Sequence, residues 1–82
     1  MTEARKRFDE ILLNYSPSGD EVITDETLLE DDLAFDSLDV VEVVMGVEKE
    51  FNISIQDQYV ENVKTVGEMY AAFKNQHPHI FD

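Results

Sequence analysis

Apolar residues recur at helical spacing in three stretches of the chain. The first stretch has them at i, i+3, i+4 and i+7, as Phe8, Ile11, Leu12 and Tyr15. This pattern predicts a helix with one apolar face, capped at its start by Thr2. The sequence Ser16-Pro17-Ser18-Gly19-Asp20 is expected to end it, because proline disfavours helix in the residue before it and glycine favours a turn.

The second stretch, residues 37–51, has two apolar arcs instead of one when its residues are advanced by about 100° each. The first arc contains Val40, Val43, Val44, Val47 and Phe51, and we expect it to face the core. The second contains Leu38, Val41 and Met45, bordered by Glu42 and Lys49, with Glu48 between the two arcs. One helix of so small a domain is not expected to bury both arcs, so the second arc is a candidate docking surface.

The third stretch follows a capping box formed by Thr65 and Glu68. Its inner face is predicted to contain Val66, Met69, Tyr70 and Phe73. Before it, residues 57–62 suggest a short helix that holds Tyr59, Val60 and then Val63 against the core.

The predicted fold is therefore all-α, a four-helix bundle with three longer helices and one short helix. A long loop, residues 21–35, joins the first two helices, and we expect its leucines to hold it against them. Residues 1–76 should form the domain, and residues 77–82, which follow the expected end of the last helix, should form a mobile C-terminal tail.

Composition narrows the partners and the compartment. The 82 residues contain 6 Lys and Arg against 19 Asp and Glu, a net charge of −13, and no cysteine. Nucleic acid is an unsuitable partner for such a chain, because binding it requires cations that replace its counterions. Disulfides and thiolate metal sites are excluded. Because the sequence shows neither a secretory signal nor an apolar run of membrane-spanning length, we expect a cytoplasmic protein, or a protein of an organelle after processing. We also expect it to be a monomer.

The start of the second helix carries the candidate chemistry. Asp36 can accept from the backbone at the N-cap, and Asp39 then falls at the third helical position, as in a capping box. Ser37 is placed in the first turn, beside backbone N–H groups that have no partner within the helix. Such a helix N-terminus is a favourable place for a phosphate ester.

Asp36-Ser37-Leu38-Asp39, together with Val41-Glu42-Val43-Val44-Met45, Glu48-Lys49-Glu50-Phe51 and Thr65-Val66-Gly67-Glu68, closely resembles the acyl carrier protein family. The resemblance runs from about Leu28 to Phe73. It implies that Ser37 carries a 4′-phosphopantetheine arm, obtained from coenzyme A through a phosphopantetheinyl transferase. It further implies that acyl groups are attached to the arm as thioesters in fatty-acid, polyketide or specialised lipid biosynthesis. It implies that partner enzymes meet the acidic residues with basic patches, namely Asp36, Asp39, Glu42 and Glu48. Leu38, Val41 and Met45 would form the apolar centre of the same partner-binding surface.

Three positions depart from the family pattern. Ala34 stands where glycine is usual, the bulky Phe35 follows it, and Gln56 stands where proline is common. These departures bear on the subtype and on the shape of the loop, and Ala34-Phe35 favours a specialised member of the family. Phe35 is expected either to anchor the loop or to stack over the mouth of an acyl pocket.

Other readings of these residues remain open. Ser37 can be an ordinary residue of a first helical turn, and it cannot be a nucleophile of its own, because the only histidines, His77 and His79, lie in the tail. The chain is thus expected to be a carrier and not an enzyme. The rival classes are an acidic helical interaction module without a prosthetic group and an acidic cation buffer. We expect no metal site; the alternative is a weak divalent-cation site at Glu30-Asp31-Asp32.

Overall fold

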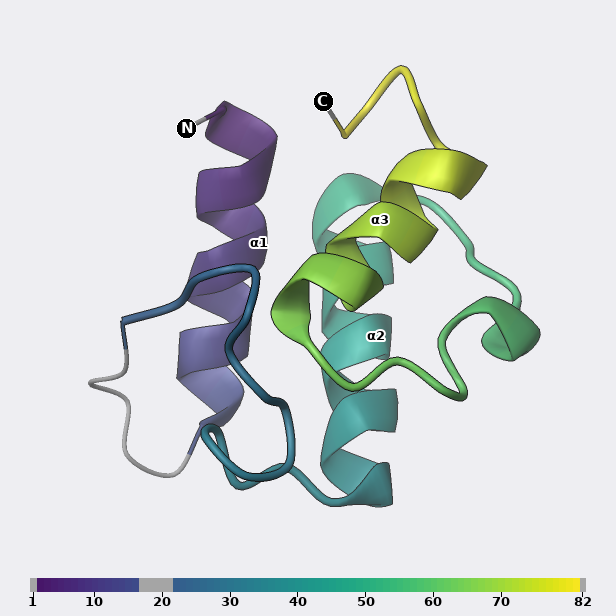
Figure 1. Ribbon diagram of the computed structural model, residues 1–82. Helices are drawn as coiled ribbons and strands as arrows, with labels where there is room; N and C mark the ends of the chain where they lie inside the picture. The colour runs from purple at the N-terminus through teal and green to yellow at the C-terminus, as the bar shows by residue number, and fades with distance from the viewer. Residues whose placement is uncertain (1, 17–21, 82) are drawn as a thin grey trace.

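The computed structural model describes residues 2–16 and 22–81, which contain three α-helices and one short 3-10 helix (Figure 1). In chain order these are α1 (Glu3–Tyr15), α2 (Ser37–Phe51), η1 (Asp57–Tyr59) and α3 (Val66–Gln76). The described residues form no strand, only an isolated bridge between Leu28 and Thr65. The all-α class is confirmed. The short helix predicted over residues 57–62 is a single 3-10 turn followed by irregular chain.

Helices α1 and α2 run side by side in opposite directions, and α3 lies across α2 (Figure 1). Thr2 caps α1, with its hydroxyl oxygen accepting from the Arg5 N–H, as predicted. The helix ends at Tyr15, with Ser16, the first residue of the predicted stop signal, as its C-cap. The rest of that signal, residues 17–20, lies outside the described residues. Gly46 allows the close approach of the two helices, because a Cβ there would lie 3.2 Å from a ring carbon of Tyr15.

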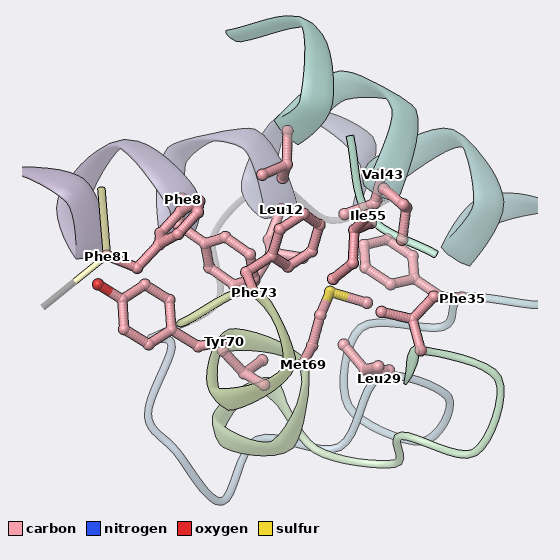
Figure 2. Packing of buried hydrophobic residues seen from close by; sticks show 14 of the residues in the cluster. Phe8, Leu12, Leu29, Phe35, Val43, Ile55, Met69, Tyr70, Phe73 and Phe81 are labelled. Carbon is pink, nitrogen blue, oxygen red and sulfur yellow. The ribbon is translucent and has the colours of Figure 1, made fainter. Parts of the chain in front are cut away.

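The core has an aromatic end and an aliphatic end (Figure 2). At the aromatic end, Phe8 meets the Tyr70 ring edge-on at 5.2 Å between centroids, and Phe81 meets Tyr70 at 5.6 Å. At the aliphatic end lie Leu29, Phe35 and Met69. The predicted core face of α2 is confirmed, with Val43, Val44 and Val47 buried and Val40 and Phe51 partly buried.

The connection before α2 is tied to the start of α3 by its backbone. Leu29 N–H donates to the Lys64 carbonyl over 2.9 Å, and Val66 N–H donates to the Thr27 carbonyl over 2.9 Å. Leu29 and Leu33 are buried, as expected of the loop leucines, while Leu28 is partly exposed. The loop is thus a fixed part of the domain between residues 22 and 36.

A charged network ties the same loop to α1. The Arg5 guanidinium bonds to the Asp9 carboxylate, with 2.9 Å between Nε and Oδ1, and to the Asp25 carboxylate, with 2.6 Å between Nη1 and Oδ1. Burial raises the pKa of Asp9, although its contact with Arg5 acts in the opposite direction. The Arg5 side chain also lies over the Tyr70 ring, 5.0 Å from its centroid.

The predicted capping box of α3 is present. Thr65 Oγ1 accepts from the Glu68 N–H, and Glu68 Oε1 accepts from the Thr65 N–H. Backbone donors at Lys64 and Thr65 lower the pKa of Glu68, because they favour its ionised form. Tyr59, expected against the core, is instead exposed over 45% of its surface, whereas Val60, expected there too, is buried.

The C-terminal segment differs from the expected mobile tail. Phe81 is fully buried against Phe51, Tyr70 and Phe73. Turn hydrogen bonds from Ile80 and Phe81 to the His77 carbonyl bring its ring back onto the core. Residues 77–81 therefore pack with the domain and complete its aromatic end. Their position after the last helix was the only basis for predicting a mobile tail.

Replacing Phe81 with Ala should lower the free energy of unfolding by about 3–5 kcal/mol, because it leaves a cavity in the aromatic end of the core. Denaturant unfolding of Phe81→Ala measures this. The control is His79→Ala, an exposed position two residues away, which should change stability little. If both variants unfold at the same denaturant concentration, residues 77–81 are loose in solution and Phe81 is not part of the core.

Candidate functional site

The start of α2 is fixed by a reciprocal capping box. Asp36 is the N-cap, with Oδ1 accepting from the Asp39 N–H over 2.9 Å, and Asp39 Oδ2 accepts from the Asp36 N–H over 3.1 Å. This confirms the predicted cap. Ser37 is the first helical residue, and its side chain is exposed.

The segment that leads into the cap alternates between core and solvent. Leu33 and Phe35 are buried, whereas Ala34 and Asp36 are exposed. Phe35 N–H donates to the Leu29 carbonyl over 2.9 Å, which fixes the residue just before the cap. With Phe35 buried, the side chains that follow it at the helix start, Asp36 and Ser37, both reach solvent.

Ala34 has the left-handed backbone conformation, with φ of 59°. This conformation is costly for a residue with a Cβ, by about 1–2 kcal/mol, and glycine adopts it without that cost. The departure noted in the sequence, alanine where the family usually has glycine, thus falls at a position where the backbone favours glycine.

The second apolar arc of α2 is exposed, as predicted. Leu38, Val41 and Met45 expose 71%, 55% and 61% of their surfaces, and we call these three residues the docking face. Glu42 and Lys49, at its border, are also exposed. Exposed apolar side chains of this size, set beside one another on a helix, are typical of surfaces that meet a partner.

Glu48 differs from its predicted place among the exposed recognition residues. It is only half-exposed, and its Oε2 accepts from the Ile55 N–H over 2.8 Å. This carboxylate therefore ties the chain after α2 back onto the helix. Nothing in the local pattern around Glu48 signalled a partner seven residues away.

A surface groove of about 740 Å³ opens beside Ser37. One wall is the Ser37 side of α2, and the other is the chain from Asp57 to Lys64 together with the loop at residues 28–31. Its apolar lining is Leu28, Leu29, Phe35, Val40, Val41, Val44, Met45, Val60 and Val63. Its charged lining is Glu30, Asp31, Asp36, Glu48, Asp57, Glu61 and Lys64. Sequence reasoning did not find this second wall, because Val60 and Val63 read simply as core residues.

The groove and the cap together favour a covalently attached group over a freely bound one. Asp36 and Asp39 place two carboxylates at the helix start, and these repel a free phosphate. An exposed hydroxyl, in contrast, can be esterified by an enzyme, and the bond then holds the group in place. The residues present therefore fit a phosphopantetheine arm on Ser37, with an apolar groove within its reach.

The acidic loop has a structural role in part. Asp32 Oδ2 accepts from the Leu28 N–H over 2.8 Å, which closes the turn before α2. Within residues 2–16 and 22–81, no three His, Asp or Glu side chains are grouped as a metal ion would require. In the same residues, no helix is both long and apolar enough to cross a bilayer.

The sequence profile of the family described as "Phosphopantetheine attachment site" matches residues 12–73, and this places the chain in the class of phosphopantetheine-bearing domains. Two curated relatives are acyl carrier proteins. That of Buchnera aphidicola subsp. Baizongia pistaciae is 38% identical over 90% of this chain and 95% of its own. That of Phenylobacterium zucineum is 38% identical over 83% of this chain and 86% of its own.

Among solved structures, a putative acyl carrier protein from Mycobacterium tuberculosis superposes with a TM-score of 0.79 at 30% identity, covering 89% of this chain and 97% of that one. The chain belongs to the acyl carrier protein family. The proteins of this family are carriers and not enzymes, and they bear phosphopantetheine covalently.

Replacing Ala34 with Gly should raise the free energy of unfolding by up to about 1 kcal/mol, because it relieves the left-handed backbone at a small entropic cost. Denaturant unfolding measures the difference. Ala71→Gly, at an exposed position inside α3, is the matched control and should lose about 1 kcal/mol. A loss of stability in Ala34→Gly comparable to that in Ala71→Gly would contradict the strained conformation of Ala34.

Proposed function

We propose that Ser37 is the attachment residue and that the chain shuttles acyl groups, as thioesters, between enzymes of fatty-acid or related lipid or polyketide biosynthesis. The observation that carries the proposal is the exposed Ser37 side chain at the start of α2, held there by the Asp36–Asp39 capping box. The family and the adjoining groove support it.

Among the described residues, neither histidine serves Ser37, because His77 contacts the Ser54 carbonyl and His79 is exposed after α3. The carboxylates of Asp36 and Asp39 are engaged in the capping box, so we assign the general base to the transferase. On attachment the Ser37 oxygen bonds to the pantetheine-side phosphorus of coenzyme A. Adenosine 3′,5′-bisphosphate then leaves, and the hydroxyl proton passes to the base of the transferase.

The same helix end provides the surface that partner enzymes would recognise. The docking face supplies an apolar centre, and Asp36, Asp39 and Glu42 supply negative charge around Ser37. Basic patches on the transferase and on acyl-processing enzymes complement this charge. Charge of this kind raises the rate of encounter and sets orientation more than it deepens affinity, which suits a carrier that visits several enzymes.

We further propose that the carrier acts as a cytoplasmic monomer. With a net charge of −13, two copies repel each other, and the docking face stays available for basic partners. The alternative reading, an acidic interaction module without a prosthetic group, uses the same surface but leaves Ser37 unmodified.

Incubation with coenzyme A and a phosphopantetheinyl transferase should add one phosphopantetheine to the folded chain, as read by intact mass. Ser37→Ala should show no gain, because it lacks the receiving oxygen. The matched control is Ser54→Ala, at another exposed serine, which should be modified like the parent chain. An unmodified parent chain, with the transferase shown to be active on another carrier, would favour the interaction module.

Glu42→Lys should slow this modification roughly three- to tenfold at low salt, because it opposes the basic surface of the transferase. Its melting temperature should stay near that of the parent, since Glu42 is exposed. The measurement is kcat/KM for modification at low and high salt, with Glu42→Gln as the intermediate case. Equal rates for all three chains at low ionic strength would show that Glu42 is merely solvated.

Glu48→Lys provides a contrast within the same helix. It removes the acceptor of the Ile55 N–H, so it should lower the free energy of unfolding by about 1–3 kcal/mol in addition to any effect on rate. Denaturant unfolding separates the two positions. If Glu42→Lys and Glu48→Lys are equally stable, the bond from Ile55 to Glu48 contributes nothing to the fold in solution.

A further inference from the structure

The groove beside Ser37 has a floor formed by buried side chains. Leu29, Phe35, Val44 and Val60 all line it, yet each is exposed over less than a tenth of its surface. Val41 and Met45, which also line it, are exposed and form its outer edge. An apolar chain entering from the Ser37 side therefore meets a closed apolar floor, of which Phe35 is the largest side chain.

Behind Phe35 lies the aliphatic end of the core. Figure 2 shows the Phe35 side chain at that end, together with Leu29, and with Val43, Ile55 and Met69 nearby, far from the aromatic end. Met69 is fully buried, and methionine is the side chain that adapts most readily to a change of neighbours. The Phe35 ring thus fills space at this end of the core that a deeper groove would need.

Phe35 is fixed in this position by its backbone. Its N–H donates to the Leu29 carbonyl, and it directly precedes the Asp36 cap. Phe35 and Val40 hold the positions of a hydrophobic staple, in which the residue before the N-cap packs on the fourth helical residue. Ala34, just before it, is in a strained conformation. The Phe35 ring is therefore held in place as part of the groove floor and does not act as a mobile gate.

We propose that Phe35 limits the depth of the groove and thereby makes short, apolar acyl groups the ones that this carrier shelters. The inference rests on the proposed function, because the acyl group reaches the groove from the arm on Ser37, which itself lines the groove. A short chain is buried between α2 and residues 57–64. The part of a longer chain that extends past the floor stays in water, so it adds no stabilisation from burial.

The test uses the full chain loaded from butyryl-, octanoyl- and dodecanoyl-coenzyme A by a phosphopantetheinyl transferase, with loading verified by mass. The melting temperature of each form is compared with that of the same chain bearing the arm without an acyl group. In the parent chain, the rise should level off at a shorter acyl chain than it does in Phe35→Ala. In Phe35→Ala, the rise should continue to octanoyl or beyond.

A second readout is cleavage of the thioester by hydroxylamine. In the parent chain, octanoyl and butyryl forms should be cleaved at similar rates relative to the corresponding free thioesters. In Phe35→Ala, cleavage of the octanoyl form should slow several-fold, because the enlarged groove holds the chain and shields the thioester. Phe35→Leu keeps an apolar side chain, so its octanoyl form should be cleaved at a rate between those of the parent chain and Phe35→Ala. It replaces Phe35→Ala in the test if that variant does not fold.

Phe51→Ala is the matched control, because Phe51 is an aromatic residue of the same helix bundle that does not line the groove. It should lose stability without changing the dependence on chain length. A melting temperature that rises from butyryl to dodecanoyl equally in the parent and the Phe35 variants would overturn the role of Phe35. Absence of loading altogether would instead refute attachment at Ser37, so the two failures are distinguishable.

Discussion

The exposure of Ser37 depends on how the chain before α2 is buried. Leu29, Leu33 and Phe35 enter the core, and backbone hydrogen bonds from Leu29 and Val66 join that loop to the start of α3. With the loop fixed in this way, Asp36 can cap α2 only at one register, and Ser37 becomes its first residue. The position of the serine is thus a product of core packing some residues earlier, and not of local helix chemistry alone.

Several features near this helix start cost stability, although the Asp36–Asp39 capping box itself stabilises it. Ala34 adopts a left-handed conformation that an L-residue disfavours. Leu38, Val41 and Met45 stay in water, and acidic residues gather around Ser37 in a chain of strongly negative charge. Natural proteins tolerate such costs where a partner surface needs them, while the aromatic end of the core and the Arg5 network stabilise the rest of the domain.

The sequence was sufficient for features that depend on neighbours within a helical turn or two. Both capping boxes, the core face of α2 and the exposed docking face follow from spacing alone, and the structure confirms them. It was insufficient where the partner lies outside the same helix. Three features arise from tertiary packing, which the spacing of apolar residues does not predict. They are the bond from Ile55 to Glu48, the burial of Phe81 in the core and the groove wall at residues 57–64.

The account centres on one oxygen, that of Ser37, among the four serines of the chain, Ser16, Ser18, Ser37 and Ser54. Peptide mapping by mass spectrometry, after reaction of the folded chain with coenzyme A and a transferase, tests it most directly. The account predicts phosphopantetheine on the peptide that contains Ser37 and on no other. Modification at Ser16, Ser18 or Ser54, with Ser37 unmodified, would contradict it.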